Sequence, residues 1–156
     1  MMTITEKTIY LDCDGTWIDL YGVEGWLEML QAYDPAPYEL AKPLVNLSLL
    51  ARTIHQLQNA GYKVGIISWL SKCSTEDYDR AVTQAKLNWF KKHIPSVVWD
   101  EIHIVPYGTP KSECGCGILF DDEERNRKEW NGIAFDEKDL IANLKMILKG
   151  VADDVL

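Results

Sequence analysis

Short β-rich runs alternate with amphipathic stretches along this chain, and that alternation constrains its fold more than any other feature. Parallel strands need a crossover connection, usually a helix, so strand and helix signals in turn indicate a parallel sheet. We therefore predict an α/β protein with a three-layer Rossmann-like fold, in which helices cover both faces of a mainly parallel, five-stranded sheet. The 156 residues suit a single domain spanning 1–156.

Individual elements follow from periodicity and from residues that begin or end helices. Apolar residues spaced three and four apart predict a helix over 44–60, and Gly61 follows it where a left-handed cap is favoured. Ser74 and Asp77 are spaced like a helix cap and its first-turn acid, which predicts a helix to about His93. Strands are predicted over 8–11, 62–67, 102–105, 117–120 and 132–135, and further helices over 23–32 and 137–148.

Polar side chains occur where the predicted strands end. Because the carboxyl ends of parallel strands converge on one crevice, side chains at these ends are expected to share a single site. The residues in question are Asp12, Asp14, Ser68, Lys111, Asp121 and Asp122.

This set of side chains has the parts that phosphoryl transfer needs, namely a nucleophile, a proton shuttle and positive charge around the phosphoryl oxygens. Asp12 can attack phosphorus and form an aspartyl-phosphate. Asp14 can protonate the leaving group and later take a proton from water. Gly15 permits a sharp exit from the strand, which lets backbone amides face a phosphate. The predicted phosphate-binding residues are Ser68, Lys111, Gly15 and Thr16.

Carboxylates from two strand ends also predict a metal site. Asp12 and Asp14 would repel each other unless a cation lay between them. Asp121 and Asp122 add the oxygen ligands that a hard ion such as Mg²⁺ prefers. Mg²⁺ is therefore the expected cofactor.

The same residues resemble the four motifs of the haloacid dehalogenase (HAD) superfamily. An apolar strand leads into Asp12-Cys13-Asp14-Gly15-Thr16, and the serine, the lysine and the aspartate pair follow in the superfamily's order. The resemblance implies Asp12 as nucleophile and Asp14 as general acid/base. It also implies magnesium held by Asp12, the backbone carbonyl of Asp14 and the aspartate pair, with Asp122 in more direct contact than Asp121. An Asp at position 14 is typical of the superfamily's phosphatases, so hydrolysis of a phosphomonoester is favoured.

Substrate choice in this superfamily usually depends on a cap insertion. Only residues 18–43 remain for one here, enough for one helix and a loop, so a small cap and a fairly open site are predicted. The short approach from Lys111 to Asp121 and the run Ile-Leu-Phe-Asp-Asp are similar to the 5′(3′)-deoxyribonucleotidase branch, which implies a nucleoside monophosphate as substrate. Trp17 and Trp69 are candidates for stacking on a base, although packing of the cap against the core is an equally open interpretation.

Composition limits the partners. The formal charge of −8 argues against an extended nucleic-acid surface but permits a small phosphorylated substrate. Apolar runs are too short to cross a membrane, and Met1–Glu6 does not resemble a signal peptide, so a cytoplasmic location is expected. Cys114 and Cys116 could bind zinc if Cys73 or His103 joined them, but small residues in a tight loop are the favoured interpretation.

Two alternatives to a nucleotidase remain open. Within enzymes, the chain could be a phosphatase of nucleic-acid ends or of sugar phosphates. From another class, it could be a non-catalytic metal- or nucleotide-binding module with the same fold. The acidic and basic run 123–128 is predicted to be a solvated helix start.

Overall fold

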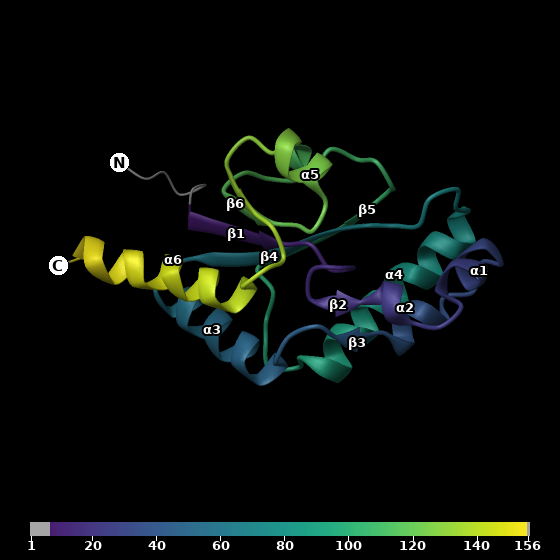
Figure 1. The fold of residues 1–156 in the computed structure, drawn as a ribbon, viewed down its shortest axis with the longest axis horizontal. Coiled ribbons are helices and arrows are strands. Elements are labelled where there is room, and N and C mark those ends of the chain that lie inside the picture. Colours follow the sequence, from purple (N-terminus) through teal and green to yellow (C-terminus); the bar gives the residue numbers. More distant parts are fainter. Residues whose placement is uncertain (1–6, 156) are drawn as a thin grey trace.

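A five-stranded parallel sheet forms the centre of the molecule, as the computed structural model of residues 7–155 shows (Figure 1). The strand order is β5-β4-β1-β6-β7, and every pairing is parallel. The predicted α/β fold with five parallel strands is therefore confirmed. Residues 1–6 and 156, which the single-domain and signal-peptide predictions include, lie outside the described residues. The strands are β1 (Thr8–Leu11), β4 (Lys63–Trp69), β5 (Glu101–Val105), β6 (Ile118–Phe120) and β7 (Ile133–Phe135).

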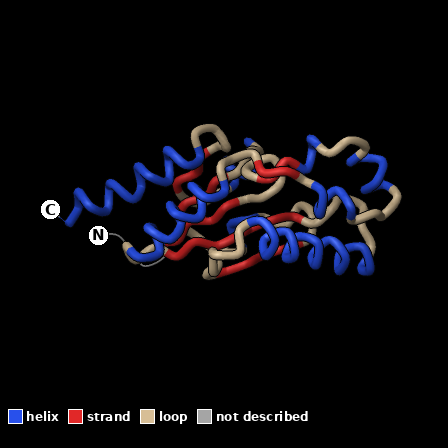
Figure 2. The backbone as a smooth tube through the Cα atoms, turned by 90° about the horizontal axis from the view of Figure 1, so that it is seen from below, coloured by secondary structure: helices blue, strands red, loops and turns tan. Residues whose placement is uncertain are grey.

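Helices cover both faces of this sheet, so that the strands lie in a middle layer (Figure 2). On one face, Ile9 and Leu11 of β1 pack in a buried cluster with side chains of α3 (Leu47–Asn59), α4 (Glu76–His93) and α6 (Leu140–Val155). On the other face, Tyr10 packs with Trp130, which follows α5 (Glu124–Glu129). Successive residues of β1 thus point to opposite faces and are buried on both, as expected of a central parallel strand.

Most predicted boundaries agree with the structure to within a few residues. Gly61 has a φ of 100°, as its predicted position after α3 requires. The cap of α4 is Thr75 rather than Ser74, because its hydroxyl accepts a hydrogen bond from the amide of Tyr78 at 3.1 Å. Helix α6 begins at Leu140, later than predicted, and continues to Val155.

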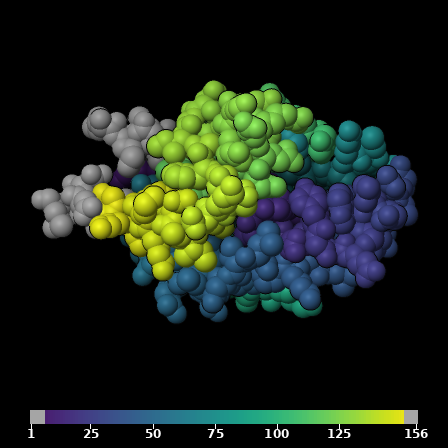
Figure 3. Space-filling view, in the orientation of Figure 1, coloured from purple at the N-terminus to yellow at the C-terminus, as the bar shows by residue number. Residues whose placement is uncertain are grey.

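Residues 18–43 form more structure than the predicted helix and loop. Two short antiparallel strands, β2 (Ile18–Asp19) and β3 (Lys42–Pro43), close a segment that holds a 3-10 helix and two α-helices. Figure 3 shows this segment, coloured purple to dark blue, at the right-hand end of the molecule. The elements between the strands are η2 (Leu20–Gly22), α1 (Trp26–Gln31) and α2 (Ala36–Leu40), and α2 packs against α4.

Among the described residues, no helix is both long enough and apolar enough to cross a lipid bilayer. The four cysteines, at positions 13, 73, 114 and 116, are all free thiols.

Candidate active site

A buried lysine joins two of the predicted carboxylates at the carboxyl end of the sheet. Asp12 follows β1, Asp121 follows β6, and Lys111 begins the 3-10 helix η3 (Lys111–Glu113). The Lys111 Nζ lies 2.7 Å from Asp12 Oδ1 and 2.7 Å from Asp121 Oδ2. It also donates to the backbone carbonyl of Ile67 at 3.1 Å. The convergence predicted from the strand ends is therefore present for these three residues.

Charge around Asp12 keeps its carboxylate ionised. Burial raises the pKa of Asp12, but the Lys111 ammonium and hydrogen bonds from its neighbours outweigh burial, so that the net pKa is lowered. Burial lowers the pKa of Lys111, but the Asp12 and Asp121 carboxylates raise this pKa by more than burial lowers it, so the net shift is upward. A carboxylate that stays charged in a buried position has the state that a nucleophile needs.

The turn after β1 ties Asp12 to Asp122. The Thr16 Oγ1 lies 2.8 Å from Asp12 Oδ2 and 3.2 Å from Asp122 Oδ1, and it accepts from the Asp122 amide at 3.1 Å. The amides of Gly15 and Thr16 donate within the turn, to the carbonyls of Ile18 and Cys13. The prediction that Gly15 and Thr16 bind phosphate is therefore not supported, because their donors are already used. These two residues position carboxylates instead.

Gly15 allows Asp122 to approach the turn closely. Its φ is 84°, and a Cβ built there would lie 2.3 Å from Asp122 Oδ2. We expect Gly15→Ala to destabilise the protein by about 1–3 kcal/mol in urea denaturation, through backbone strain and displacement of Asp122. Gly61→Ala is the matched control, because Gly61 has a φ of 100° with no atom within 4 Å of the added carbon. Equal losses in the two variants would show that the contact with Asp122 costs nothing.

Three carboxylates lie close enough to hold one metal ion. Oxygens of Asp12, Asp121 and Asp122 lie within 4.8 Å of one another. Burial, followed by the charge of Asp12, raises the pKa of Asp121 to about 6 and that of Asp122 to about 8. This crowding of buried acids is the situation that a divalent cation relieves, and hard oxygen donors suit Mg²⁺.

The partners of the aspartate pair differ. Asp121 is engaged by Lys111, by the Glu123 amide at 2.9 Å and by Asn126 at 3.0 Å. The Asp122 carboxyl group contacts the Thr16 hydroxyl at 3.2 Å and shares a hydrogen bond with the Asp12 carboxylate, and no lysine pairs with it among the described residues. The closer role of Asp122 at a metal stays a prediction. In the same described range, the acidic triad is the metal-compatible group, and Cys114 and Cys116 do not form one with Cys73 or His103.

Asp14 is not part of this triad, and its side chain meets a second buried lysine that the sequence analysis missed. The Lys86 Nζ lies 3.2 Å from Asp14 Oδ2, 2.6 Å from Ser68 Oγ and 2.7 Å from the Trp69 carbonyl. Burial raises the pKa of Asp14, and Lys86 opposes this without cancelling it, so that the net shift is upward. A signal was present in the sequence, because Lys86 falls on the buried stripe of α4 between Val82 and Phe90, where an unpaired charge is not expected.

Ser68 lies inside β4 rather than after it, and its side chain is fully buried. Its hydroxyl contacts Lys86, and Ser68 is not part of the wall of the adjoining pocket. The predicted contact between Ser68 and phosphate is therefore not supported. Ser71, three positions further along, does line the pocket, and its hydroxyl lies 2.5 Å from that of Tyr38.

A pocket of about 480 Å³ opens above Asp12, Asp14, Lys111 and Asp121. Its remaining wall is largely apolar and comes from the 18–43 segment and from the loops after β4 and β5. Trp69 belongs to this wall, where it is held by a 2.7 Å hydrogen bond to the Thr109 carbonyl. The aromatic residues lining the pocket are Tyr21, Trp26, Tyr33, Tyr38, Trp69 and Tyr107.

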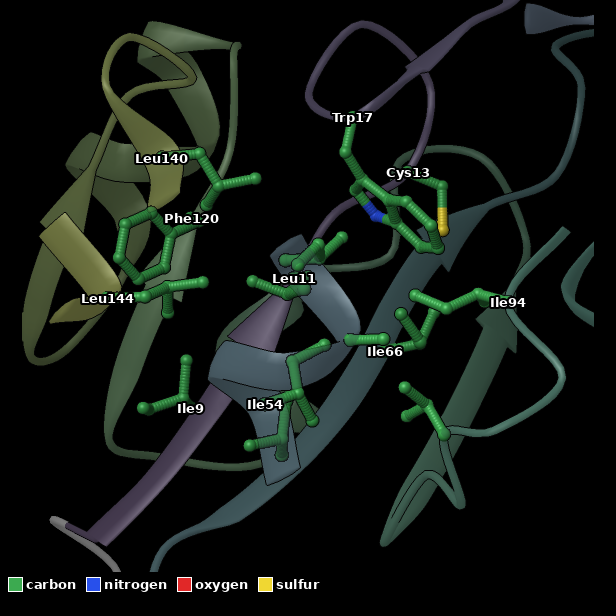
Figure 4. Close-up of a cluster of buried hydrophobic side chains, with 14 of the residues drawn as sticks. Ile9, Leu11, Cys13, Trp17, Ile54, Ile66, Ile94, Phe120, Leu140 and Leu144 are labelled. Atoms are coloured by element: carbon green, nitrogen blue, oxygen red, sulfur yellow. The ribbon is translucent and has the colours of Figure 1, made fainter. Parts of the chain in front are cut away.

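Trp17 is not available to a substrate, so that prediction is wrong. Its side chain is fully buried in the core (Figure 4), and it is stacked on Phe90 with ring centroids 5.8 Å apart. It also contacts Trp89 and Trp99. Of the two interpretations of this tryptophan, packing is therefore the correct one.

The run 123–128 is less solvated than predicted. Asn126 is buried and donates to Asp121, and Arg127 donates to the Asp121 carbonyl at 3.0 Å. Arg125 is exposed, and its guanidinium lies over the Trp69 ring, 4.9 Å from the centroid. This short helix therefore supports the acidic pair and the pocket wall.

No protein-family model matches this chain, and no curated protein matches it either. Fold and site define an α/β protein with a buried acid–lysine centre at the carboxyl end of its sheet.

Proposed function

We propose that this protein is a HAD-type, Mg²⁺-dependent phosphomonoester hydrolase that acts through an aspartyl-phosphate on Asp12. The observation that carries the proposal is the setting of Asp12, a buried carboxylate at the floor of a pocket, bonded by Lys111 on one oxygen and Thr16 on the other. A carboxylate held this firmly has the orientation that in-line attack on phosphorus requires.

The reaction divides into two steps. In the first, an Asp12 oxygen forms a bond to phosphorus while the bond to the leaving oxygen breaks, and Asp14 gives that oxygen a proton. In the second, a water oxygen forms a bond to phosphorus while the bond between phosphorus and the Asp12 oxygen breaks, and one water proton passes to Asp14. Inorganic phosphate leaves, and the Asp12 carboxylate and the protonated Asp14 are restored. Lys111 offsets part of the negative charge of Asp12 and Asp121. Asp12, Asp121 and Asp122 would hold Mg²⁺, which supplies further positive charge beside the phosphoryl oxygens.

A nucleoside monophosphate is the substrate class that the pocket suits best. The polar floor would take the phosphoryl group, and the wall offers aromatic rings at Tyr21, Trp26 and Tyr107, each partly or largely exposed. Such rings can stack on a base irrespective of its hydrogen-bonding pattern. The proposal is thus a small phosphorylated substrate with a planar group beyond the phosphate.

Metal binding can be tested apart from turnover. We expect isothermal titration to show one Mg²⁺ site, and Asp122→Asn to weaken it at least about tenfold, because one of three charged ligands is lost. Glu129→Gln is the control, since it removes the same charge at an exposed position. Unchanged affinity in Asp122→Asn would place any metal elsewhere.

A phosphatase screen tests the proposed activity. Phosphate release is measured with nucleoside monophosphates, sugar phosphates and 3′- or 5′-phosphorylated oligonucleotides, each with Mg²⁺ and with excess EDTA. We expect release from nucleoside monophosphates in Mg²⁺ and none in EDTA. Release from oligonucleotides alone, or from sugar phosphates alone, would overturn the proposed substrate. Tight nucleotide binding with no release from any compound would identify a binding module instead.

A further inference from the structure

A second buried lysine lies at the site without a part in the mechanism above. Lys86 comes from the middle of α4, and its side chain is 4% exposed. Burying an ammonium is costly unless every proton is bonded and an opposite charge lies close by. Such a residue needs specific partners to be stable, and those partners indicate its role.

The ammonium of Lys86 has three protons and three acceptors. These are Asp14 Oδ2, Ser68 Oγ and the Trp69 carbonyl, at 3.2, 2.6 and 2.7 Å. With its donors used in this way, Lys86 has none left for a ligand. Whatever Lys86 contributes must therefore act through one of these three groups.

Asp14 is the partner that faces the pocket. Its side chain is 15% exposed and lines the pocket, while its Oδ2 is held by Lys86. The other oxygen, Oδ1, has no hydrogen bond among the described residues. Lys86 therefore holds Oδ2 of Asp14, while Oδ1 remains available to a group that enters the pocket.

The anchor itself is rigid. Ser68 and the Trp69 carbonyl both belong to β4, so they fix the ammonium relative to the central sheet. The Tyr38 ring of α2 lies 5.2 Å from Nζ and covers it from the side of the 18–43 segment. Lys86 therefore holds Asp14 at a fixed place relative to Asp12, which the neighbouring strand positions.

We propose that Lys86 is a positioning residue that orients the Asp14 carboxyl group toward the leaving oxygen of the substrate. This inference rests on the proposed phosphatase function and adds to it. Proton transfer depends on placing the acid within hydrogen-bonding reach of the leaving oxygen. Loss of Lys86 would let Asp14 rotate away while Asp12 and Lys111 stay in place.

The test compares two leaving groups in Lys86→Met, which keeps the unbranched stem and removes the ammonium. A nucleoside hydroxyl needs a proton as it leaves, whereas p-nitrophenolate leaves readily without one. We expect kcat/KM to fall about 100-fold for a nucleoside monophosphate and less than about tenfold for p-nitrophenyl phosphate. Because kcat/KM covers only the steps up to departure of the leaving group, slow hydrolysis of the aspartyl-phosphate does not obscure the comparison.

A double-mutant cycle with Asp14→Asn separates positioning from a structural role. If Lys86 acts through Asp14, adding Lys86→Met to Asp14→Asn should cause no further loss with the nucleotide. Lys86→Gln, whose amide can still donate to Asp14, should recover part of the activity. The same cycle is run with Lys86→Gln if Lys86→Met does not fold in circular dichroism.

Equal slowing with both substrates, or additive losses in the cycle, would overturn the role of Lys86 while leaving the phosphatase proposal intact. A wild-type protein without activity toward either substrate would instead overturn the proposed function on which this inference rests. The two failures are therefore distinguishable in one set of assays.

Discussion

Asp12→Asn is expected to lower phosphate release by about four orders of magnitude or more, because an amide cannot attack phosphorus. The substitution replaces one carboxylate oxygen by an amide NH₂ group, so the remaining oxygen can accept from Lys111 or from Thr16 but not from both. Turnover is measured in Mg²⁺ with saturating substrate, and acid-quenched wild-type protein is examined for phosphate bound to Asp12. Detection of that adduct in the wild type and its loss in the variant would trace the covalent step to this residue.

The control for this variant must separate chemistry from folding. Circular dichroism and urea denaturation of Asp12→Asn should show a folded protein, because Lys111 keeps Asp121 as its charged partner. Near-native turnover in a folded Asp12→Asn would remove the proposed mechanism, whichever substrate is used.

Lys111→Met is expected to destabilise the protein by about 3–5 kcal/mol, the typical effect of removing one partner from a buried ion pair. The Lys111 side chain is 2% exposed, and its loss leaves Asp12 and Asp121 together without a cation. Urea denaturation in the absence of metal measures the change in the free energy of unfolding. Lys128→Met is the matched control, because Lys128 pairs with Glu124 at the surface, where the expected change is below about 0.5 kcal/mol.

A second substitution checks the physical reason. The double variant Lys111→Met/Asp121→Asn removes one of the two unpaired carboxylate charges, so its free energy of unfolding should be higher than that of Lys111→Met alone. A loss in Lys111→Met no larger than that in Lys128→Met would mean that the buried acids are already neutral, contrary to the charge balance described for the site.

The sheet and half of the site were predictable from the sequence, because both depend on where strands end. Asp12 and Asp121 follow β-rich runs directly, and parallel strands bring such positions to one edge. Lys111 lies ten positions before Asp121, so little chain separates the two. These features depend on the order of elements along the chain, which sequence patterns report well.

The predictions that failed depend on side-chain direction instead. Ser68 was placed after a strand, but β4 runs one residue past it, and its hydroxyl points to Lys86. Trp17 was a candidate for stacking on a base, but its side chain lies in the core. Lys86 lies on the buried face of α4, which the sequence does indicate. Which side chains the Lys86 ammonium meets depends on how α4 packs against the sheet, and no local sequence pattern predicts that packing.

The central position of β1 in the sheet affects the order in which the strands can pair during folding. The middle strand of the sheet, β1, is synthesised before the other four strands of that sheet, and both of its edges are paired only after β4 and then β6 have followed. Asp12 meets Lys111 across 99 positions, and Asp14 meets Lys86 across 72. Contacts between residues this far apart in the sequence form slowly, because closing the long loop costs conformational entropy before the contacts stabilise the fold. Until the two lysines are synthesised, Asp12 and Asp14 lack these charged partners, so the acid–lysine centre is among the last parts of the protein to form.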